Sequence, residues 1–305
     1  MIVPQDRDVI SSAGVSEDGR ATGGPAPRIS DLLRAPAGPV DLKTMSTSAT
    51  PGFAGAGKAD AQAELVSLAD EVALLQQLFA QGRAGGSRRL LLVLQGMDTS
   101  GKGATVEHVL GAVNPMGVRY HAFARPTIEE REHHFLWRVK RRLPGPGIIG
   151  VFDRSHYEDV LVVRVHQLVP PEQWATRYDV INRFEARLST TTKVVKCFLH
   201  ISAEEQRKRL LARLEDPRKW WKYQPGDLDE RARWDDYQLA YADVLCRCNA
   251  EAAPWYVVPS DRKWYRNWAV SRILVEQLHT MGLTWPTPSG WDPETERARL
   301  RELAA

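Results

Sequence analysis

The stretch LLLVLQGMDTSGKGATV, residues 90–106, determines our interpretation of the fold. Its continuous aliphatic run is typical of a strand buried on both faces of a parallel sheet. The spacing G-x-x-x-x-G-K that follows is that of a phosphate-binding loop, in which amide hydrogens and the positive end of the next helix meet phosphate oxygens. The alternative is a glycine-rich turn without a ligand. We therefore expect a phosphate or nucleotide site formed by Gly96, Met97, Asp98, Thr99, Ser100, Gly101, Lys102 and Gly103.

Two positions of this loop depart from the usual pattern. Gly103 stands where a Ser or Thr hydroxyl normally ligates magnesium, so other groups must hold the metal. Asp98 adds a carboxylate that would repel phosphates unless a cation lies between them. We therefore predict that Asp98 is a metal ligand and that Lys102 neutralises a terminal phosphate. The alternative role of Asp98 is to stabilise the loop as an Asx-turn residue.

A second group of charges follows an apolar strand in GIIGVFDRSHYEDVLVVRV, residues 147–165. The strand ends in Asp153, as does the second metal-binding element of phosphate-loop enzymes, which we expect beside the first strand. Arg154 is suited to bidentate binding of a transferred phosphate. Asp153 could instead cap the next helix. Because further charges gather at the strand exit, we predict a site that also contains Glu158, Asp159 and Arg164.

A basic, aromatic-rich segment, RLEDPRKWWKYQPGDLDERARWDDY, occupies residues 213–237. Pro217, Pro225 and Gly226 interrupt its helical pattern. This composition suits a mobile lid over residues 207–235 that closes on an anionic substrate. The alternative is a solvated surface with its aromatic side chains in the core. The cations that we expect to bind phosphate are Arg213, Arg218, Lys219 and Lys222.

Strand and helix patterns alternate along the rest of the chain, which predicts an α/β fold: a three-layer arrangement with a parallel sheet covered by helices on both faces. The expected strands are 89–95, 118–123, 147–152, 193–201 and 254–259. The expected helices are 60–81, 102–113, 128–143, 172–188, 203–217 and 261–279. Capping boxes at Thr127–Glu130 and Ser202–Glu205 open two of these helices.

Composition limits the classes of function. The net charge of +3, from 41 basic and 38 acidic residues, is too small for nucleic-acid coating, and we find no motif for base readout. The three cysteines form neither a disulfide framework nor a zinc pattern. The chain has no secretory signal pattern, and no apolar run approaches the roughly 20 residues of a membrane span. We expect a cytoplasmic protein that binds neither nucleic acid nor membrane.

The composition also suggests domain boundaries. Residues 1–30, rich in Gly, Ala, Pro, Ser and Thr, are expected to form a flexible tail. The segment ISDLLRAPAGPVDL, residues 29–42, is expected to pack as an extended arm. We predict a catalytic domain over residues 31–290 and a C-terminal tail over residues 291–305.

Several motifs together resemble the polyphosphate kinase 2 family, over about residues 29–288: LQGMDTSGKGA, NPMGV, HHFLWRV, FDRSHYEDVLVVRVH, RKWWKYQPGDLDERARWDDY and APWYVVPSDRKWYRNWAVSRIL. The resemblance implies a thymidylate-kinase-like phosphate-loop fold with a helical lid. It also implies phosphoryl transfer between inorganic polyphosphate and nucleotides with magnesium, manganese being the alternative metal. By position, Asp98 and Lys102 correspond to the Walker A loop, and Asp153 and Arg154 to the Walker B element. A homodimer or homotetramer is expected on the same grounds.

Within that family, SHYEDVLVVRV resembles the third subclass, which implies that both AMP and ADP are acceptors, with GMP and GDP as alternatives. Asp153 departs from the Asn that many members of this subclass carry. In the mechanism that we expect, Lys102 and Asp98 bind the acceptor phosphate, and polyphosphate lies along Arg154, Arg164 and the lid cations. Two rival functions remain: an ATP-dependent nucleotide or small-metabolite kinase, and a non-catalytic polyphosphate-binding protein.

Overall fold

The computed structural model describes residues 27–67, 69–111 and 115–303. In this part of the chain, five strands form one sheet in the order β2-β3-β1-β4-β5, and every neighbouring pair is parallel. The predicted parallel sheet is therefore confirmed, as is the position of the Asp153 strand beside the first strand. The strands are β1 (Arg89–Gln95), β2 (Val118–Ala122), β3 (Ile149–Asp153), β4 (Thr192–His200) and β5 (Trp255–Pro259).

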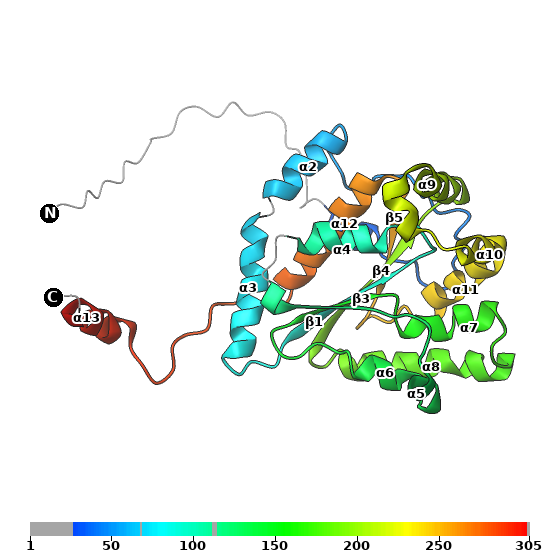
Figure 1. The fold of residues 1–305 in the computed structure, drawn as a ribbon. Coiled ribbons are helices and arrows are strands. Elements are labelled where there is room, and N and C mark those ends of the chain that lie inside the picture. The colour runs from blue at the N-terminus through cyan, green and yellow to red at the C-terminus, as the bar shows by residue number, and fades with distance from the viewer. Residues whose placement is uncertain (1–26, 68, 112–114, 304–305) are drawn as a thin grey trace, which may run out of the picture.

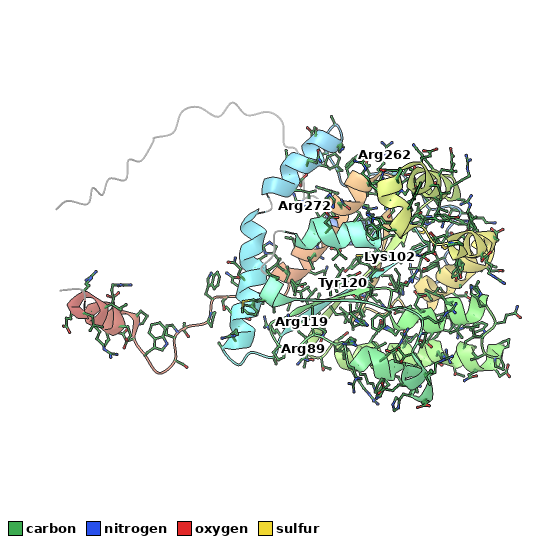
Figure 2. The ribbon with its side chains drawn as sticks, in the orientation of Figure 1. Arg89, Lys102, Arg119, Tyr120, Arg262 and Arg272 are labelled. Atoms are coloured by element: carbon green, nitrogen blue, oxygen red, sulfur yellow. The ribbon has the colours of Figure 1, made fainter. Side chains whose placement is uncertain are left out.

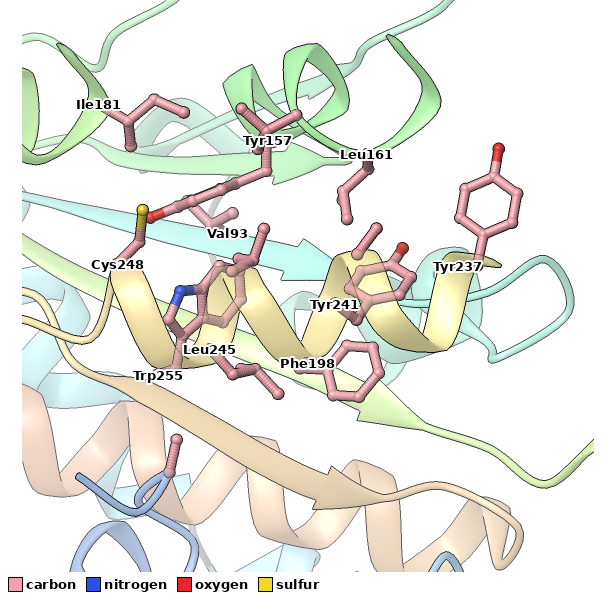
Figure 3. Packing of buried hydrophobic residues seen from close by; sticks show 14 of the residues in the cluster. Val93, Tyr157, Leu161, Ile181, Phe198, Tyr237, Tyr241, Leu245, Cys248 and Trp255 are labelled. Atoms are coloured by element: carbon pink, nitrogen blue, oxygen red, sulfur yellow. The ribbon is translucent and has the colours of Figure 1, made fainter. Parts of the chain in front are cut away.

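The central strand β1 explains the continuous aliphatic run, because both of its faces are buried. Leu91 and Val93 point into one core, against α8 (Pro171–Leu188) and α11 (Trp234–Arg247), part of which is shown in Figure 3. Leu90, Leu92 and Leu94 point into the other core. There they meet α12 (Lys263–His279), and α3 (Ala69–Arg83) and α4 (Lys102–Leu110) lie on the same side (Figure 1). Burying each such side chain stabilises the fold by about 1.5–3 kcal/mol.

One predicted helix, over residues 128–143, is interrupted in the structure. The capping box of Thr127 and Glu130 is present and opens α5 (Ile128–Glu132). His133 is extended, and α6 begins only at Leu136 (Leu136–Lys140). The His134 ring nitrogen Nδ1 accepts a hydrogen bond from the Leu136 amide at 3.2 Å, so a side chain replaces the helical partner there. The prediction of one helix was wrong because the extended backbone at His133 ends α5, and α6 starts anew after Phe135.

The second predicted capping box forms only in part. Ser202 Oγ accepts from the Glu205 amide at 3.1 Å and opens α9 (Ala203–Glu215). The Glu205 carboxylate does not turn back to the cap, because it accepts from Arg209 Nε at 2.8 Å one turn later. The predicted lead-in helix corresponds to α2 (Lys58–Ser67) and α3, with Leu68 outside the described residues.

The predicted arm begins with one helical turn, α1 (Ile29–Leu32), so it is not extended throughout. Ile29 and Ser30 are buried, and both amides donate to the Glu276 carboxylate of α12 at 2.8 Å. These two residues therefore belong to the packed body, although we predicted them within the flexible tail. Of the rest of that prediction, Pro27 and Arg28 are exposed, and residues 1–26 lie outside the described residues.

Short elements complete the chain: η1 (Pro115–Gly117), η2 (His156–Asp159), α7 (Val162–Val165), η3 (Pro217–Lys222) and α10 (Gly226–Ala232). The predicted C-terminal tail contains the helix α13 (Pro293–Leu303), which buries no side chain and lies apart from the sheet (Figure 1). None of the helices within residues 27–67, 69–111 and 115–303 combines the length and apolar character needed to cross a membrane.

Candidate active site

The phosphate-type loop between β1 and α4 needs glycine at two positions. Gly101 has φ +105°, and a Cβ there would lie 1.8 Å from Nη1 of Arg266. At Gly96, a Cβ would lie 2.7 Å from the Leu199 carbonyl oxygen. Gly103 differs, because a Cβ there would meet no atom within 4 Å. The missing hydroxyl at position 103 is therefore not a result of crowding.

Side chains from two helices hold the loop from behind. Gln206 Nε2 donates to the Asp98 carbonyl oxygen at 3.1 Å. Arg209 Nη1 donates to the Thr99 carbonyl oxygen at 2.9 Å, and Arg266 Nη1 to that of Ser100 at 2.9 Å. All three side chains are buried. They hold Thr99 at φ +64°, a conformation that residues other than glycine seldom adopt.

The loop carboxylate is paired with a cation. Arg154 Nη2 donates to Asp98 Oδ1 at 2.8 Å, and the register of the two parallel strands, Leu94 opposite Asp153, brings them together. Burial raises the pKa of Asp98, but Lys102 and Arg154 outweigh it, so the pKa lies below its ordinary value. Asp98 is therefore ionised at neutral pH and is a competent ligand for a cation.

Lys102 is folded into the loop. Figure 2 labels it at the start of α4, and its Nζ donates to the carbonyl oxygens of Gly96 at 2.8 Å and Met97 at 3.3 Å. Burial lowers the pKa of Lys102, and the charge of Arg154 lowers it further, while Asp153, Asp98 and Glu158 oppose the change. The charges of three carboxylates therefore act on the Lys102 ammonium group. The oxygens of a bound phosphate would compete with the two loop carbonyls for its hydrogen bonds.

Asp153 accepts a hydrogen bond from the Tyr120 hydroxyl of β2 at 3.3 Å. Burial and then Asp153 raise the pKa of Tyr120 to about 12, so the phenol stays protonated and remains a donor. Sequence analysis missed Tyr120, since only the pairing of β2 with β3 brings it to the site (labelled in Figure 2). The charge of Glu158 raises the pKa of Lys102 and of Arg154. Burial raises the pKa of Glu158 itself.

The structure thus brings together five of the predicted site residues: Asp98, Lys102, Asp153, Arg154 and Glu158. Other predicted residues form ion pairs with side chains outside this group. Asp159 pairs with Arg177 at 3.0 Å. Arg164 pairs with Asp243, and its guanidinium lies 4.8 Å from the Trp174 ring centroid.

The predicted lid cations also have local partners. Arg218 and Lys219 contact the carboxylate of Asp216 at 3.0 and 2.9 Å, and Lys222 lies 4.9 Å from the Trp221 ring centroid. Arg213 pairs with Asp227 at 3.3 Å and is also near enough to lower the pKa of Asp98. Arg213 is therefore the member of this group that the structure links to the loop.

The segment after β3 is anchored by a buried charged network. Lys196 Nζ donates to Glu185 Oε2 at 2.6 Å, to the Tyr157 hydroxyl at 2.8 Å and to the Cys248 carbonyl oxygen at 2.8 Å. His156 Nε2 lies 3.0 Å from Glu185 Oε1. Burial raises the pKa of Glu185, but Lys196 and His156 outweigh it and the net pKa is low. Figure 3 shows Tyr157 and Cys248 in this core. The network fixes η2, which carries Glu158.

The loop has unsatisfied polar atoms, as a ligand site requires. Thr99 Oγ1 and Ser100 Oγ are buried, with no hydrogen-bond partner among the described residues. In the same part of the chain, no three His, Cys, Asp or Glu side chains form a metal cage. Magnesium typically takes one or two carboxylates and completes its shell with phosphate and water oxygens. The carboxylates of Asp98 and Asp153 fit that donor set.

A parallel sheet with a glycine–lysine loop after its central strand, and an acid at the end of the neighbouring strand, defines a phosphate-loop kinase fold. The family model described as "Polyphosphate kinase 2 (PPK2)" matches residues 56–284, and the chain belongs to this family.

Similar proteins agree with this assignment. The chain is 45% identical over 254 residues to an AMP/ADP-polyphosphate phosphotransferase from Meiothermus ruber, which covers 83% of this chain and 94% of the relative. It is 41% identical to an ADP-polyphosphate phosphotransferase from Rhodopseudomonas palustris, over 75% of this chain and 80% of the relative. The crystal structure of polyphosphate kinase 2 from Arthrobacter aurescens TC1 aligns with a TM-score of 0.87 and 46% identity, covering 91% of this chain and 98% of that one.

Proposed function

We propose that this protein transfers a phosphoryl group between inorganic polyphosphate and a nucleotide, AMP or ADP. The proposal rests on one observation. Lys102 and Arg154 lie with the carboxylates of Asp98 and Asp153 at the carboxyl ends of the neighbouring strands β1 and β3. Membership of the family supports it, and the similar proteins from Meiothermus ruber and Rhodopseudomonas palustris are named for transfer between polyphosphate and AMP/ADP or ADP. An ATP-dependent metabolite kinase and a non-catalytic polyphosphate binder are not favoured by these comparisons.

The chemistry that we propose depends on position and charge. Lys102 exchanges its two bonds to loop carbonyls for oxygens of a terminal phosphate, and Arg154 grips the transferred group. An oxygen of the acceptor phosphate attacks the terminal phosphorus of polyphosphate in line, while the bond from that phosphorus to the bridging oxygen breaks and the shortened polyphosphate leaves with its electron pair. Because the attacking oxygen is already ionised near neutral pH, no strong general base is needed. Catalysis is then alignment plus neutralisation of charge at preorganised donors.

We propose magnesium as the metal, with manganese as the alternative, held by Asp98 and Asp153. When bound, the ion would supply neutralisation of the facing phosphates. We also propose that residues 207–235 act as a lid. Within that segment, the charge of Arg213 lowers the pKa of the loop carboxylate Asp98. Arg218, Lys219 and Lys222 would have to leave their present partners to reach polyphosphate.

Product analysis tests the proposal. Purified protein is incubated with magnesium, polyphosphate and one of AMP, ADP, GMP or GDP, and the nucleotides are separated and quantified. We expect AMP to yield ADP and ATP. A reaction with diphosphates alone would overturn the assignment of both acceptors. ATP-driven phosphorylation of AMP without any use of polyphosphate would overturn the proposal itself.

A further inference from the structure

The helix that leads into the lid also contacts the phosphate loop, through Gln206 in its first turn. The buried Gln206 amide uses both of its ends: Nε2 donates to the Asp98 carbonyl oxygen at 3.1 Å, and Oε1 accepts from Arg231 Nη1 at 2.8 Å. Arg231 belongs to α10, on the far side of the lid segment. One side chain therefore lies between the lid and the residue that carries the loop carboxylate.

The lid end of this connection is well fixed. Arg231 Nη1 also donates to the Ala203 carbonyl oxygen at 2.8 Å. The preceding residue, Glu230, accepts from His166 Nε2 at 2.9 Å and from the Tyr237 hydroxyl. These contacts seat the Arg231 guanidinium on Gln206 in this conformation, and a displacement of α10 would have to break them and would move Arg231 relative to Gln206.

At the loop end, carbonyl contacts set the direction of amide hydrogens. In a trans peptide the C=O and the following N–H point in opposite directions. Gln206 holds the carbonyl of Asp98, so it orients the amide of Thr99; Arg266 holds the carbonyl of Ser100, so it orients the amide of Gly101. Neither amide has an acceptor among the described residues. These two amides are therefore free to donate to phosphate.

Charge beneath the loop favours the same ligand. Arg209 and Arg266 both donate to the Ser100 carbonyl oxygen, at 3.1 and 2.9 Å, and both are buried. Burial and then the charge of Arg209 lower the pKa of Arg266 to about 9, so the Arg266 guanidinium remains charged at neutral pH. Two arginines therefore support the loop at the Ser100 carbonyl. Gln206 is the neutral side chain among the three that hold loop carbonyls, and it also contacts Arg231 of the lid.

We infer that Gln206 is a positioning residue that couples the lid to the phosphate loop. When Arg231 is seated on Gln206, the amide is fixed, the Asp98 peptide is held, and the loop amides point at phosphate. When Arg231 moves away, that peptide loses its constraint. This inference rests on the proposed function, since it concerns the orientation of groups for phosphoryl transfer.

The test compares Gln206→Met, Arg231→Met and the double variant in the polyphosphate and ADP assay, with kcat and KM determined separately. Glu204→Gln, on the exposed surface of the same helical turn, is the control, and thermal unfolding checks that each variant folds. We expect each single variant to lose about tenfold in kcat, the size of one hydrogen bond, with the nucleotide KM within about twofold of wild type. The double variant should lose no more than either single one. Multiplied losses in the double variant would overturn the coupling.

Gln206→Glu separates coupling from simple support of the lid. The carboxylate keeps an acceptor for Arg231 but loses the donor to the Asp98 carbonyl. We expect kcat to stay as low as in Gln206→Met, and recovery to the wild-type value would overturn the inference. Hydrogen exchange of residues 95–103 gives a readout that does not depend on turnover. Arg231→Met should speed exchange there, but not in the Gln206→Met background; equal acceleration in both backgrounds would overturn it. A wild-type protein without polyphosphate-dependent turnover would instead reject the proposed function.

Discussion

Gly101→Ala gives the sharpest test of the loop geometry. Alanine at φ +105° costs about 1–3 kcal/mol in backbone strain. Its Cβ would also lie 1.8 Å from Arg266 Nη1. A flexible side-chain end usually moves away cheaply, but this guanidinium is buried and bonded to Asn267 Oδ1 and the Ser100 carbonyl. Losing the bond to Ser100 adds about 1.5–3 kcal/mol, the usual value for a charged hydrogen bond. The expected loss in free energy of unfolding is therefore about 2.5–6 kcal/mol.

Gly103→Ala is the matched control, two residues away in the same loop. Its Cβ would meet no atom within 4 Å, and the residue lies in the first turn of α4 with ordinary helical geometry. Alanine there should stabilise the protein by about 0.4–1 kcal/mol, because it restricts the unfolded chain.

Urea denaturation followed by circular dichroism measures both variants against wild type. A typical domain has about 5–15 kcal/mol of stability, so the predicted loss for Gly101→Ala ranges from about a sixth of the total to all of it. If the free energy of unfolding of Gly101→Ala lay within about 1 kcal/mol of wild type with an unchanged slope, the contact between Gly101 and Arg266 could not be as we describe it.

Three further predictions follow from the charged groups. Lys102→Ala should lower kcat/KM by a factor of about 10²–10³, the usual cost of removing one preorganised donor, and near-native turnover with polyphosphate would exclude the role of Lys102. Because the folded-state pKa of Asp98 is below its ordinary value, its carboxylate contributes stability above about pH 4 and loses it as the pH falls through the folded value. Wild type should therefore be more stable than Asp98→Asn at pH 7, and the difference should shrink toward pH 3 in denaturant titrations; an equal difference at both pH values would contradict this. Lys196→Met removes the ammonium group from the buried Glu185 carboxylate, which keeps the Tyr157 hydroxyl and His156 Nε2 as partners, and we expect a cost of about 3–5 kcal/mol. Adding Glu185→Leu should restore part of that loss, and a double variant no more stable than the single one would argue against the pair.

The parts of the fold that sequence analysis predicted well are those with local causes. Strand β1 was predicted with the observed bounds, since a strand buried on both faces is a continuous aliphatic run. The box at Thr127 was also predicted, because both of its partners lie within four residues. The helix break at His133 was missed, since helical periodicity continues through it and only the ring of His134 replaces the helical partner.

The candidate site divides in the same way. The spacing of residues 96–103 identified the loop, and the apolar strand before Asp153 identified the second element, because both are sequence-local. Tyr120, Gln206 and Arg231 reach the loop through tertiary contacts that no short pattern encodes. The pairing of the lid cations with Asp216 had a local signal that we did not use, since this acid precedes Arg218 by two residues.

The way the loop is backed has a consequence for protein synthesis. The strand that precedes the loop needs β3 and β4 on its two sides, and the buttress under Ser100 comes from Arg209 and Arg266. A nascent chain that has emerged from the ribosome only as far as the loop therefore contains the loop sequence, but not the later residues that fix the loop conformation. The capacity to hold anions should appear only when α12 has been translated, so stalled or truncated products would not sequester nucleotides.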